Sequence, residues 1–201
     1  MLTKGIKLEN FKYVFKNSLV KKNLKIILNE NNKVLSSLGN LYKDSYKTKD
    51  ISKYKKYLNY RVIGMGGSSL GTKAIYDFLK KKIKKNFYFF DNLQSETINL
   101  KKKKYVNLIV SKSGNTVETI VNSNLLISKS DKNIFITEKK NSFLNSLAKK
   151  LKAEIIHHNN YIGGRYSVLS EVGMLPAELM GLNPNKFRQF NNLIKNKKFI
   201  N

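Results

Sequence analysis

The sequence contains no cysteine, and this absence excludes several kinds of site. Without thiols the chain forms no disulfide, has no thiolate nucleophile and offers no cysteine-based metal centre. Its only two histidines, His157 and His158, are adjacent, and no third metal ligand accompanies them. The sequence therefore indicates neither a disulfide framework nor a metal site.

Long apolar runs are also missing. No run approaches the roughly 20 residues that cross a bilayer, and residues 1–5 lead into lysine-punctuated sequence rather than the apolar core of a signal peptide. With 41% apolar residues among 201, the chain can still bury a core. We therefore expect a soluble cytoplasmic protein with no membrane partner, built as one domain or one domain with an appendage.

Acidic residues are scarce: 13 face 39 basic residues, for a net charge of +26. Such an excess usually indicates a polyanionic partner. Arginine, which binds bases and phosphates with two parallel hydrogen bonds, occurs only at Arg61, Arg165 and Arg188. Joint enrichment in Lys, Asn and Ile is typical of an AT-rich genome. Nucleic acid is therefore the less favoured partner, although a positive surface would concentrate small anionic substrates in either case.

Residues 1–58 carry apolar side chains at helical spacing among lysines and asparagines. This pattern predicts two or three amphipathic helices with a break at Gly39 and Asn40. Tyr54, Tyr57 and Tyr60 alternate with lysines and could form a platform for nucleic-acid bases. Their spacing is more typical of the packed side of a helix, which is the interpretation we favour.

From Tyr60 onward, short apolar runs alternate with helical patterns of about 10 residues. The predicted strands are 61–64, 87–90, 105–110, 133–137 and 153–156, and the predicted helices are 70–79, 116–128, 142–151, 168–181 and 185–196. Such alternation indicates βαβ units. We expect an α/β fold with a doubly wound, parallel five-stranded sheet and a helical N-terminal extension.

Ligands of such sheets bind outside the carboxyl ends of the strands, and the loop Ser-Lys-Ser-Gly-Asn-Thr at 111–116 falls there. Hydroxyls and amides at a helix N-terminus suit a phosphate, because the helix dipole and unpaired N–H groups point at it. The loop lacks the Gly-Lys-Ser/Thr ending of a P-loop. The alternative is that its hydroxyls only cap the helix.

Two further loops lie at the same predicted edge. Residues 64–68 form a glycine-rich strand-to-helix turn, which suits either a tight turn or the close approach of a ligand. Residues 163–167 place Arg165 on a flexible turn before a helix. A planar guanidinium suits an oxyanion that develops during a reaction, whereas the alternative is a structural ion pair with a carboxylate.

Three motifs follow one another in a set order. They are Gly-Met-Gly-Gly-Ser-Ser-Leu-Gly at 64–71, Ser-Lys-Ser-Gly-Asn-Thr-Val-Glu-Thr at 111–119, and Gly-Gly-Arg-Tyr-Ser at 163–167 with Gly-Met-Leu-Pro at 173–176. Together they resemble the glucose-6-phosphate isomerase family of the sugar-isomerase (SIS) superfamily. The middle motif is general to SIS domains, and the third is specific to these isomerases.

The resemblance implies reversible interconversion of glucose 6-phosphate and fructose 6-phosphate, in glycolysis and gluconeogenesis, without metal or organic cofactor. A base would move a proton between C2 and C1 while a cation stabilises the developing oxyanion. Arg165 would be the catalytic cation. The implied substrate-binding residues are Gly67, Ser68, Ser111, Lys112, Ser113 and Thr116.

The sequence also departs from the family pattern. Glu171 stands where the family usually has a small residue, and neither Glu171 nor Glu178 matches the catalytic base. The family's catalytic Glu, ring-opening His and C-terminal Lys all lie well downstream of Arg165, whereas this sequence ends at Asn201. We therefore expect the chain to supply the phosphosugar-binding half, without the usual base, and to be inactive by itself.

The expected organisation has three parts: a helical extension at 1–58, an SIS domain at 59–184, and the helical start of a missing C-terminal half at 185–201. The expected ligand is a hexose 6-phosphate. The expected partner is a second copy in a homodimer or a complementing C-terminal polypeptide. The alternative function is that of a non-catalytic SIS module that binds sugar phosphates for regulation.

Overall fold

The computed structural model describes residues 18–93, 104–128 and 130–188. The chain divides into two compact units, one of residues 43–184 and the other of residues 1–42 with 185–201. The described part of the second unit includes α1 (Ser18–Asn29) and α2 (Lys33–Ser37). The predicted break at Gly39 and Asn40 is confirmed, because α2 ends just before it. The predicted helix at 185–196 lies largely outside the described residues.

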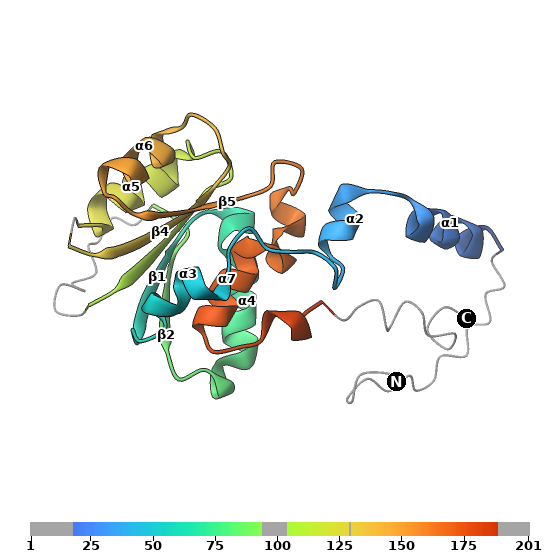
Figure 1. Cartoon of the computed structure of the whole chain (residues 1–201), viewed down its shortest axis with the longest axis horizontal. Coiled ribbons are helices and arrows are strands. Elements are labelled where there is room, and N and C mark those ends of the chain that lie inside the picture. The colour runs from blue at the N-terminus through green and yellow to red at the C-terminus, as the bar shows by residue number, and fades with distance from the viewer. Residues whose placement is uncertain (1–17, 94–103, 129, 189–201) are drawn as a thin grey trace. The chain divides into compact units, whose positions relative to one another are not determined.

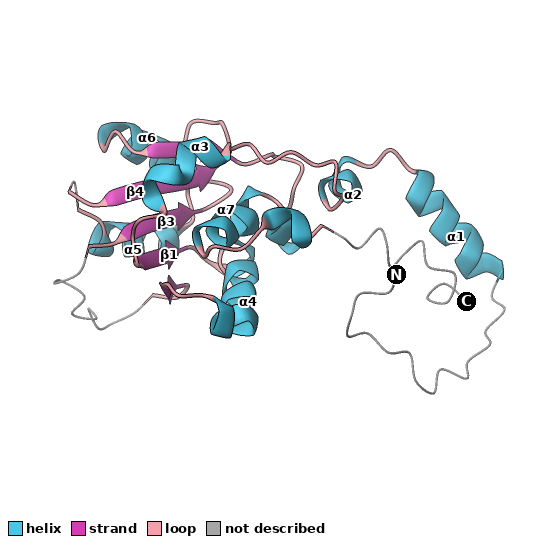
Figure 2. Cartoon of the chain, turned by 60° about the horizontal axis from the view of Figure 1, so that its bottom comes forward, coloured by secondary structure: helices cyan, strands magenta, loops and turns pink. Residues whose placement is uncertain are grey.

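The unit of residues 43–184 is built on a five-stranded sheet, shown in Figures 1 and 2. Its strands are β1 (Asn59–Ile63), β2 (Asn86–Phe90), β3 (Val106–Val110), β4 (Lys132–Thr137) and β5 (Glu154–His157). They lie in the order β2-β1-β3-β4-β5, and every neighbouring pair is parallel. The predicted parallel five-stranded sheet is therefore confirmed.

Helices cover both faces of the sheet. On one face lie α4 (Leu70–Leu79) and α7 (Glu171–Leu179), and on the other lie α5 (Val117–Leu126) and α6 (Phe143–Lys150) (Figure 1). The short α3 (Thr48–Ile51) precedes β1. Because helices cover both faces, all five residues of β3 are buried, and all of them except Asn107 are apolar. The strand order reverses between β1 and β3, which makes their carboxyl ends the expected ligand site.

The hydrophobic core holds these strand ends in place. Ile63 of β1, Ile109 of β3 and Phe135 of β4 pack with Leu144 and Ala148 of α6, and all five are buried. Each of the larger side chains, when fully buried, contributes about 1.5–3 kcal/mol. The loops that follow β1 and β3 therefore start from rigid positions.

The prediction that Tyr54, Tyr57 and Tyr60 share a helix face is wrong. Tyr54 lies in a 3₁₀ turn, whereas Tyr60 lies in β1 and stacks on Phe87 with ring centroids 4.6 Å apart. The Tyr60 hydroxyl donates to the carbonyl oxygens of Tyr54 at 2.8 Å and Tyr57 at 3.0 Å. Pairing of Asn59 and Tyr60 with the sheet overrides the helical spacing. Buried Tyr54 and Tyr60 cannot form an open platform for bases.

A second difference concerns the turn that carries Arg165. A loop followed by a helix from residue 168 was expected, but residues 164–169 form a 3₁₀ helix and α7 begins only at Glu171. Ser170 caps α7, since its hydroxyl accepts the Val172 amide at 3.4 Å. Arg165 therefore lies within a regular turn rather than in an extended loop.

Candidate active site

The three predicted loops meet at the carboxyl edge of the sheet. Gly64, just after β1, lies so close to β3 that a Cβ on it would be 2.6 Å from the Val110 carbonyl oxygen. A Cβ on Gly67 would be 2.5 Å from the carbonyl carbon of Gly164, and the Ser167 hydroxyl donates to the Gly67 carbonyl at 3.0 Å. Glycine thus allows the first loop to touch both the end of β3 and the Arg165 turn.

Three hydroxyls converge in the loop that follows β3. The Ser111 and Thr116 side-chain oxygens are 2.9 Å apart, and the Ser113 oxygen lies 3.5 Å from the first and 3.4 Å from the second. Gly114, at φ +68°, turns the backbone so that its amide donates to Ser111 Oγ at 3.1 Å. We call Ser111, Ser113 and Thr116 the hydroxyl cluster. It lies at the N-terminus of α5, where the helix dipole favours an anion.

The alternative role for these hydroxyls is helix capping. Thr116 occupies the N-cap position of α5, yet its side chain accepts no capping hydrogen bond. In α6, by contrast, the Ser142 hydroxyl accepts the Asn145 amide at 3.3 Å. The hydroxyl cluster therefore bonds mainly within its own loop and leaves the start of α5 uncapped. This geometry favours an anion site over a cap.

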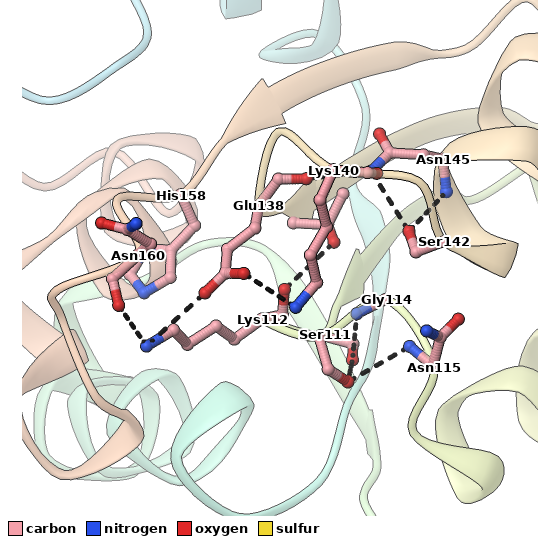
Figure 3. A network of polar contacts seen from close by, with 12 residues as sticks. Ser111, Lys112, Gly114, Asn115, Glu138, Lys140, Ser142, Asn145, His158 and Asn160 are labelled. Atoms are coloured by element: carbon pink, nitrogen blue, oxygen red, sulfur yellow. Dashed lines mark hydrogen bonds and ion pairs between the residues drawn. The ribbon is translucent and has the colours of Figure 1, made fainter.

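Lys112 has a role that the sequence did not indicate. Figure 3 shows its side chain extending away from Ser111, towards Asn160 and Glu138. Its Nζ donates to the Asn160 carbonyl at 2.5 Å and lies 3.5 Å from Glu138 Oε1, while Lys140 binds the other oxygen of Glu138 at 2.9 Å. Lys112 therefore joins the loop after β3 to the segment after β5.

The charge balance around Glu138 follows from this arrangement. Burial raises the pKa of the Glu138 carboxyl, but Lys140 and Lys112 outweigh it, so that the pKa lies below its ordinary value of 4.5. The carboxylate therefore stays ionised between the two ammonium groups. Lys112 and Lys140 share this one carboxylate, so the three side chains together keep one net positive charge.

Arg165 is exposed, and its guanidinium makes no hydrogen bond or ion pair with the residues that the structure describes. The structural ion pair considered as its alternative is thus not found among them. Arg165 borders a hollow of about 760 Å³. The hollow is lined by Gly67, Leu70, Gly71, Ala74, Gly163, Gly164, Arg165, Tyr166 and Val168. Gly67 and Arg165 therefore share one concave surface, which the hydroxyl cluster does not line.

The two carboxylates that follow Arg165 in the sequence are already engaged. Glu171 is fully buried, and its Oε1 lies 2.6 Å from His158 Nδ1. Glu178 Oε1 lies 2.8 Å from Lys55 Nζ. The sequence did not indicate the His158–Glu171 pair, whose one signal was that Glu171 departs from the pattern expected from the resemblance.

Neither a metal site nor a membrane-spanning helix is present among the described residues. Within 18–93, 104–128 and 130–188, no group of three or more His, Cys, Asp or Glu residues could hold a metal ion. No helix in this part of the chain is long and apolar enough to cross a membrane.

Sequence comparison supplies relatives. Residues 17–200 match the phosphoglucose isomerase family. The chain is 38% identical over 166 residues to a glucose-6-phosphate isomerase of Methanocaldococcus jannaschii, covering 72% of this chain and 39% of that protein. It is 32% identical over 184 residues to the corresponding enzyme of Campylobacter jejuni, covering 74% of this chain and 45% of the relative. The chain thus spans less than half the length of these relatives.

Solved structures share the fold. A hypothetical protein from Thermus thermophilus superposes with a TM-score of 0.71 at 23% identity, covering 88% of this chain and 48% of that one. A tagatose-6-phosphate ketose/aldose isomerase from Escherichia coli gives a TM-score of 0.55 at 14% identity, covering 86% of this chain and 47% of that one. At these identities the likeness concerns the fold alone, and it confirms the predicted SIS-type architecture.

Proposed function

Because the chain belongs to the phosphoglucose isomerase family, we propose that it binds a hexose 6-phosphate and contributes to the interconversion of glucose 6-phosphate and fructose 6-phosphate. The observation that carries this proposal is the hydroxyl cluster at the uncapped start of α5. The alternative, a regulatory module that only binds the sugar phosphate, uses the same cluster. The two differ in whether a proton is transferred.

The phosphate is bound by the hydroxyl cluster. Its three side-chain oxygens lie within 3.5 Å of one another and can donate to separate oxygens of one phosphate. The backbone amides at the start of α5 add donors, and the helix dipole favours the negative charge there. Lys112 contributes indirectly, because its ammonium group is bound to Asn160 and Glu138.

The sugar lies along the glycine-rich loop, toward Arg165. Ser68 is half-buried, and its hydroxyl makes no hydrogen bond with the described residues, so it can bind a sugar oxygen. The isomerisation moves a proton between C2 and C1 and passes through an enediolate, whose negative oxygen needs a cation. Arg165 supplies a guanidinium that is not committed to a carboxylate in the described part of the chain.

Neither carboxylate that follows Arg165 suits the role of the base. Glu171 is bound to His158 and Glu178 to Lys55, so neither can accept the C2 proton. We assign the base to the part of the relatives that this chain does not cover. Loss of a positioned base costs about 10²–10⁴-fold in rate, so the purified chain binds the substrate with almost no turnover.

Calorimetric titration with fructose 6-phosphate tests the proposal. Ser111→Ala removes the hydroxyl that bonds both Thr116 and the Gly114 amide, and should weaken binding about 10-fold or more. Arg165→Ala should weaken it less, because its partner charge develops later in the reaction. Ser146→Ala, an exposed serine on α6, is the matched control and should bind like the parent.

Three results would contradict the proposal. Equal affinity of the parent and Ser111→Ala would remove the site assignment. Binding of unphosphorylated glucose as tightly as fructose 6-phosphate would remove the phosphate as the recognised group. Robust turnover by the 201-residue chain would overturn the assignment of the base.

A further inference from the structure

The segment 158–162, which leads from β5 to the Arg165 turn, is anchored by a buried pair. His158 Nδ1 lies 2.6 Å from Glu171 Oε1, and the two side chains are 2% and 0% exposed. The same carboxylate oxygen accepts the Asn159 amide at 3.3 Å. The other ring nitrogen of His158 lies 3.1 Å from the Ile162 carbonyl oxygen. The start of the segment is therefore bonded to the Glu171 carboxylate, and its end at Ile162 is bonded to the His158 imidazole.

The hydrogen-bond roles follow from chemistry. A carbonyl oxygen can only accept, so His158 Nε2 must carry a proton to bond Ile162. One further proton then lies between Nδ1 and the Glu171 carboxylate, as the 2.6 Å separation requires. The His158 ring and the Glu171 carboxylate are hydrogen-bond partners in a buried site. Loss of either side chain would therefore remove a hydrogen-bond partner from the other, which is a buried polar group.

A second anchor comes from the hydroxyl-cluster loop. Lys112 Nζ donates to the carbonyl of Asn160, in the middle of the same segment (Figure 3). The segment is thus fixed by α7 through Glu171 and by the loop after β3 through Lys112. Beyond it, Gly163 and Gly164 have no side chains to restrict them, and such a pair loses much conformational entropy when ordered.

We propose that the His158–Glu171 pair is a positioning device for Arg165, with Lys112 as its second anchor. It holds the residues before the Gly163–Gly164 turn, so that the guanidinium remains at the hollow it borders. The assignment of Arg165 to the substrate rests on the proposed function, but the anchoring does not.

The scarcity of arginine provides a direct test. An arginine-specific protease can cut only after Arg61, Arg165 and Arg188. Arg165 is exposed on the anchored turn, whereas Arg61 is 7% exposed within β1 and is cut only on global opening. The ratio of native-state cleavage at Arg165 to cleavage at Arg61 therefore separates local loosening from general destabilisation.

The variants are Glu171→Gln, Glu171→Ala, His158→Leu and the double variant His158→Leu/Glu171→Ala. Each single variant should raise the Arg165-to-Arg61 cleavage ratio about 10-fold, and the double variant should match a single one, because one shared contact is lost. Glu171→Gln preserves size and an acceptor for Asn159, and keeps the test valid if the larger changes unfold the chain. Lys112→Gln should raise the ratio by a smaller factor.

Three outcomes would overturn the proposal: an unchanged ratio, equal acceleration at Arg165 and Arg61, or additive effects in the double variant. Titration of the parent with fructose 6-phosphate is run in parallel. If the parent fails to bind while the ratio changes as expected, the proposed function fails and the anchoring stands. If the parent binds while the cleavage ratio is unchanged in the variants, the anchoring proposal fails and the proposed function stands.

Discussion

Gly67 and Gly164 are in backbone contact, with no room for a side chain on the first of them. A Cβ on Gly67 would lie 2.5 Å from both the carbonyl carbon and the carbonyl oxygen of Gly164. Ser167 reinforces the contact by donating to the Gly67 carbonyl at 3.0 Å and the Gly164 carbonyl at 2.8 Å. The position of the Arg165 turn therefore depends on the glycine-rich loop after β1, and ligand binding should depend on the same contact.

Gly67→Ala should push these loops apart. Overpacking against backbone atoms costs about 1–3 kcal/mol, and the displaced loops should reduce the affinity for fructose 6-phosphate about 10-fold. Gly163→Ala is the matched control, because its Cβ would come no nearer than 4.0 Å to Tyr166 and its φ of −76° suits alanine. Thermal melting and titration measure both effects. Equal affinity of the two variants would show that the contact does not shape the site.

Removing the hydroxyl of Thr116, in the hydroxyl cluster, and removing that of Thr119, on α5, should affect ligand binding differently. Thr116→Val preserves shape but removes an oxygen 2.9 Å from Ser111 Oγ, and should weaken fructose 6-phosphate binding about 10-fold or more. Thr119 Oγ1 is buried without a hydrogen-bond partner in the described chain. Thr119→Val should therefore leave binding unchanged and raise stability by about 1 kcal/mol. Titration measures the affinity of each variant, and chemical denaturation measures its stability. Weaker binding by Thr119→Val would show that the Thr119 hydroxyl contacts the ligand.

Stability should depend on pH through Glu138. Its pKa in the folded chain lies below the ordinary 4.5, because Lys140 and Lys112 outweigh burial. A depressed carboxyl pKa contributes stability that is fully present above the unfolded-state pKa and is lost as the pH falls through the folded one. The parent should therefore melt at a higher temperature than Glu138→Gln at pH about 7, and the difference should shrink below pH about 4.5.

The control for that comparison is Glu30→Gln, which removes an exposed carboxylate just beyond α1. Its melting temperature should follow the parent's at both pH values. A difference between the parent and Glu138→Gln that persists at pH about 3 would show that packing rather than charge accounts for the effect.

The sheet could be predicted because its strands are continuous buried runs. Residues 105–110 were expected as a strand and β3 spans Val106–Val110, since a five-residue segment covered on both faces must be almost wholly apolar. The helices after the loops were found for a related reason, as their apolar positions recur at the helical period. The start of α7 was misplaced because the 3₁₀ turn before it is stabilised by contact with Gly67, which is distant in the sequence.

The hydroxyl cluster was also predictable, because Ser111, Ser113 and Thr116 are close in the sequence and one turn at Gly114 brings them together. The direction of Lys112 was not, since its partners Asn160 and Glu138 are brought near only by the order of the strands. The His158–Glu171 pair could not be predicted either, because only the fold brings the two side chains together. Local motifs can reveal residues that converge within one loop, whereas residues that hold a loop in place from elsewhere in the chain are revealed only by tertiary contacts.

Salt dependence should show whether the charge of +26 serves recognition. A polynucleotide held by lysines through about 6–10 phosphates loses about 10³–10⁵ in affinity between about 50 and 200 mM salt. Fructose 6-phosphate offers one phosphate to hydroxyls and a helix N-terminus, and Lys112 is already bound to Glu138, so its affinity should fall less than about 10-fold over that range. Titrations with single-stranded DNA and with the sugar phosphate at both salt concentrations measure how steeply each affinity falls with salt. A slope for the sugar phosphate as steep as that for DNA would mean that surface lysines, rather than the hydroxyl cluster, bind the anion.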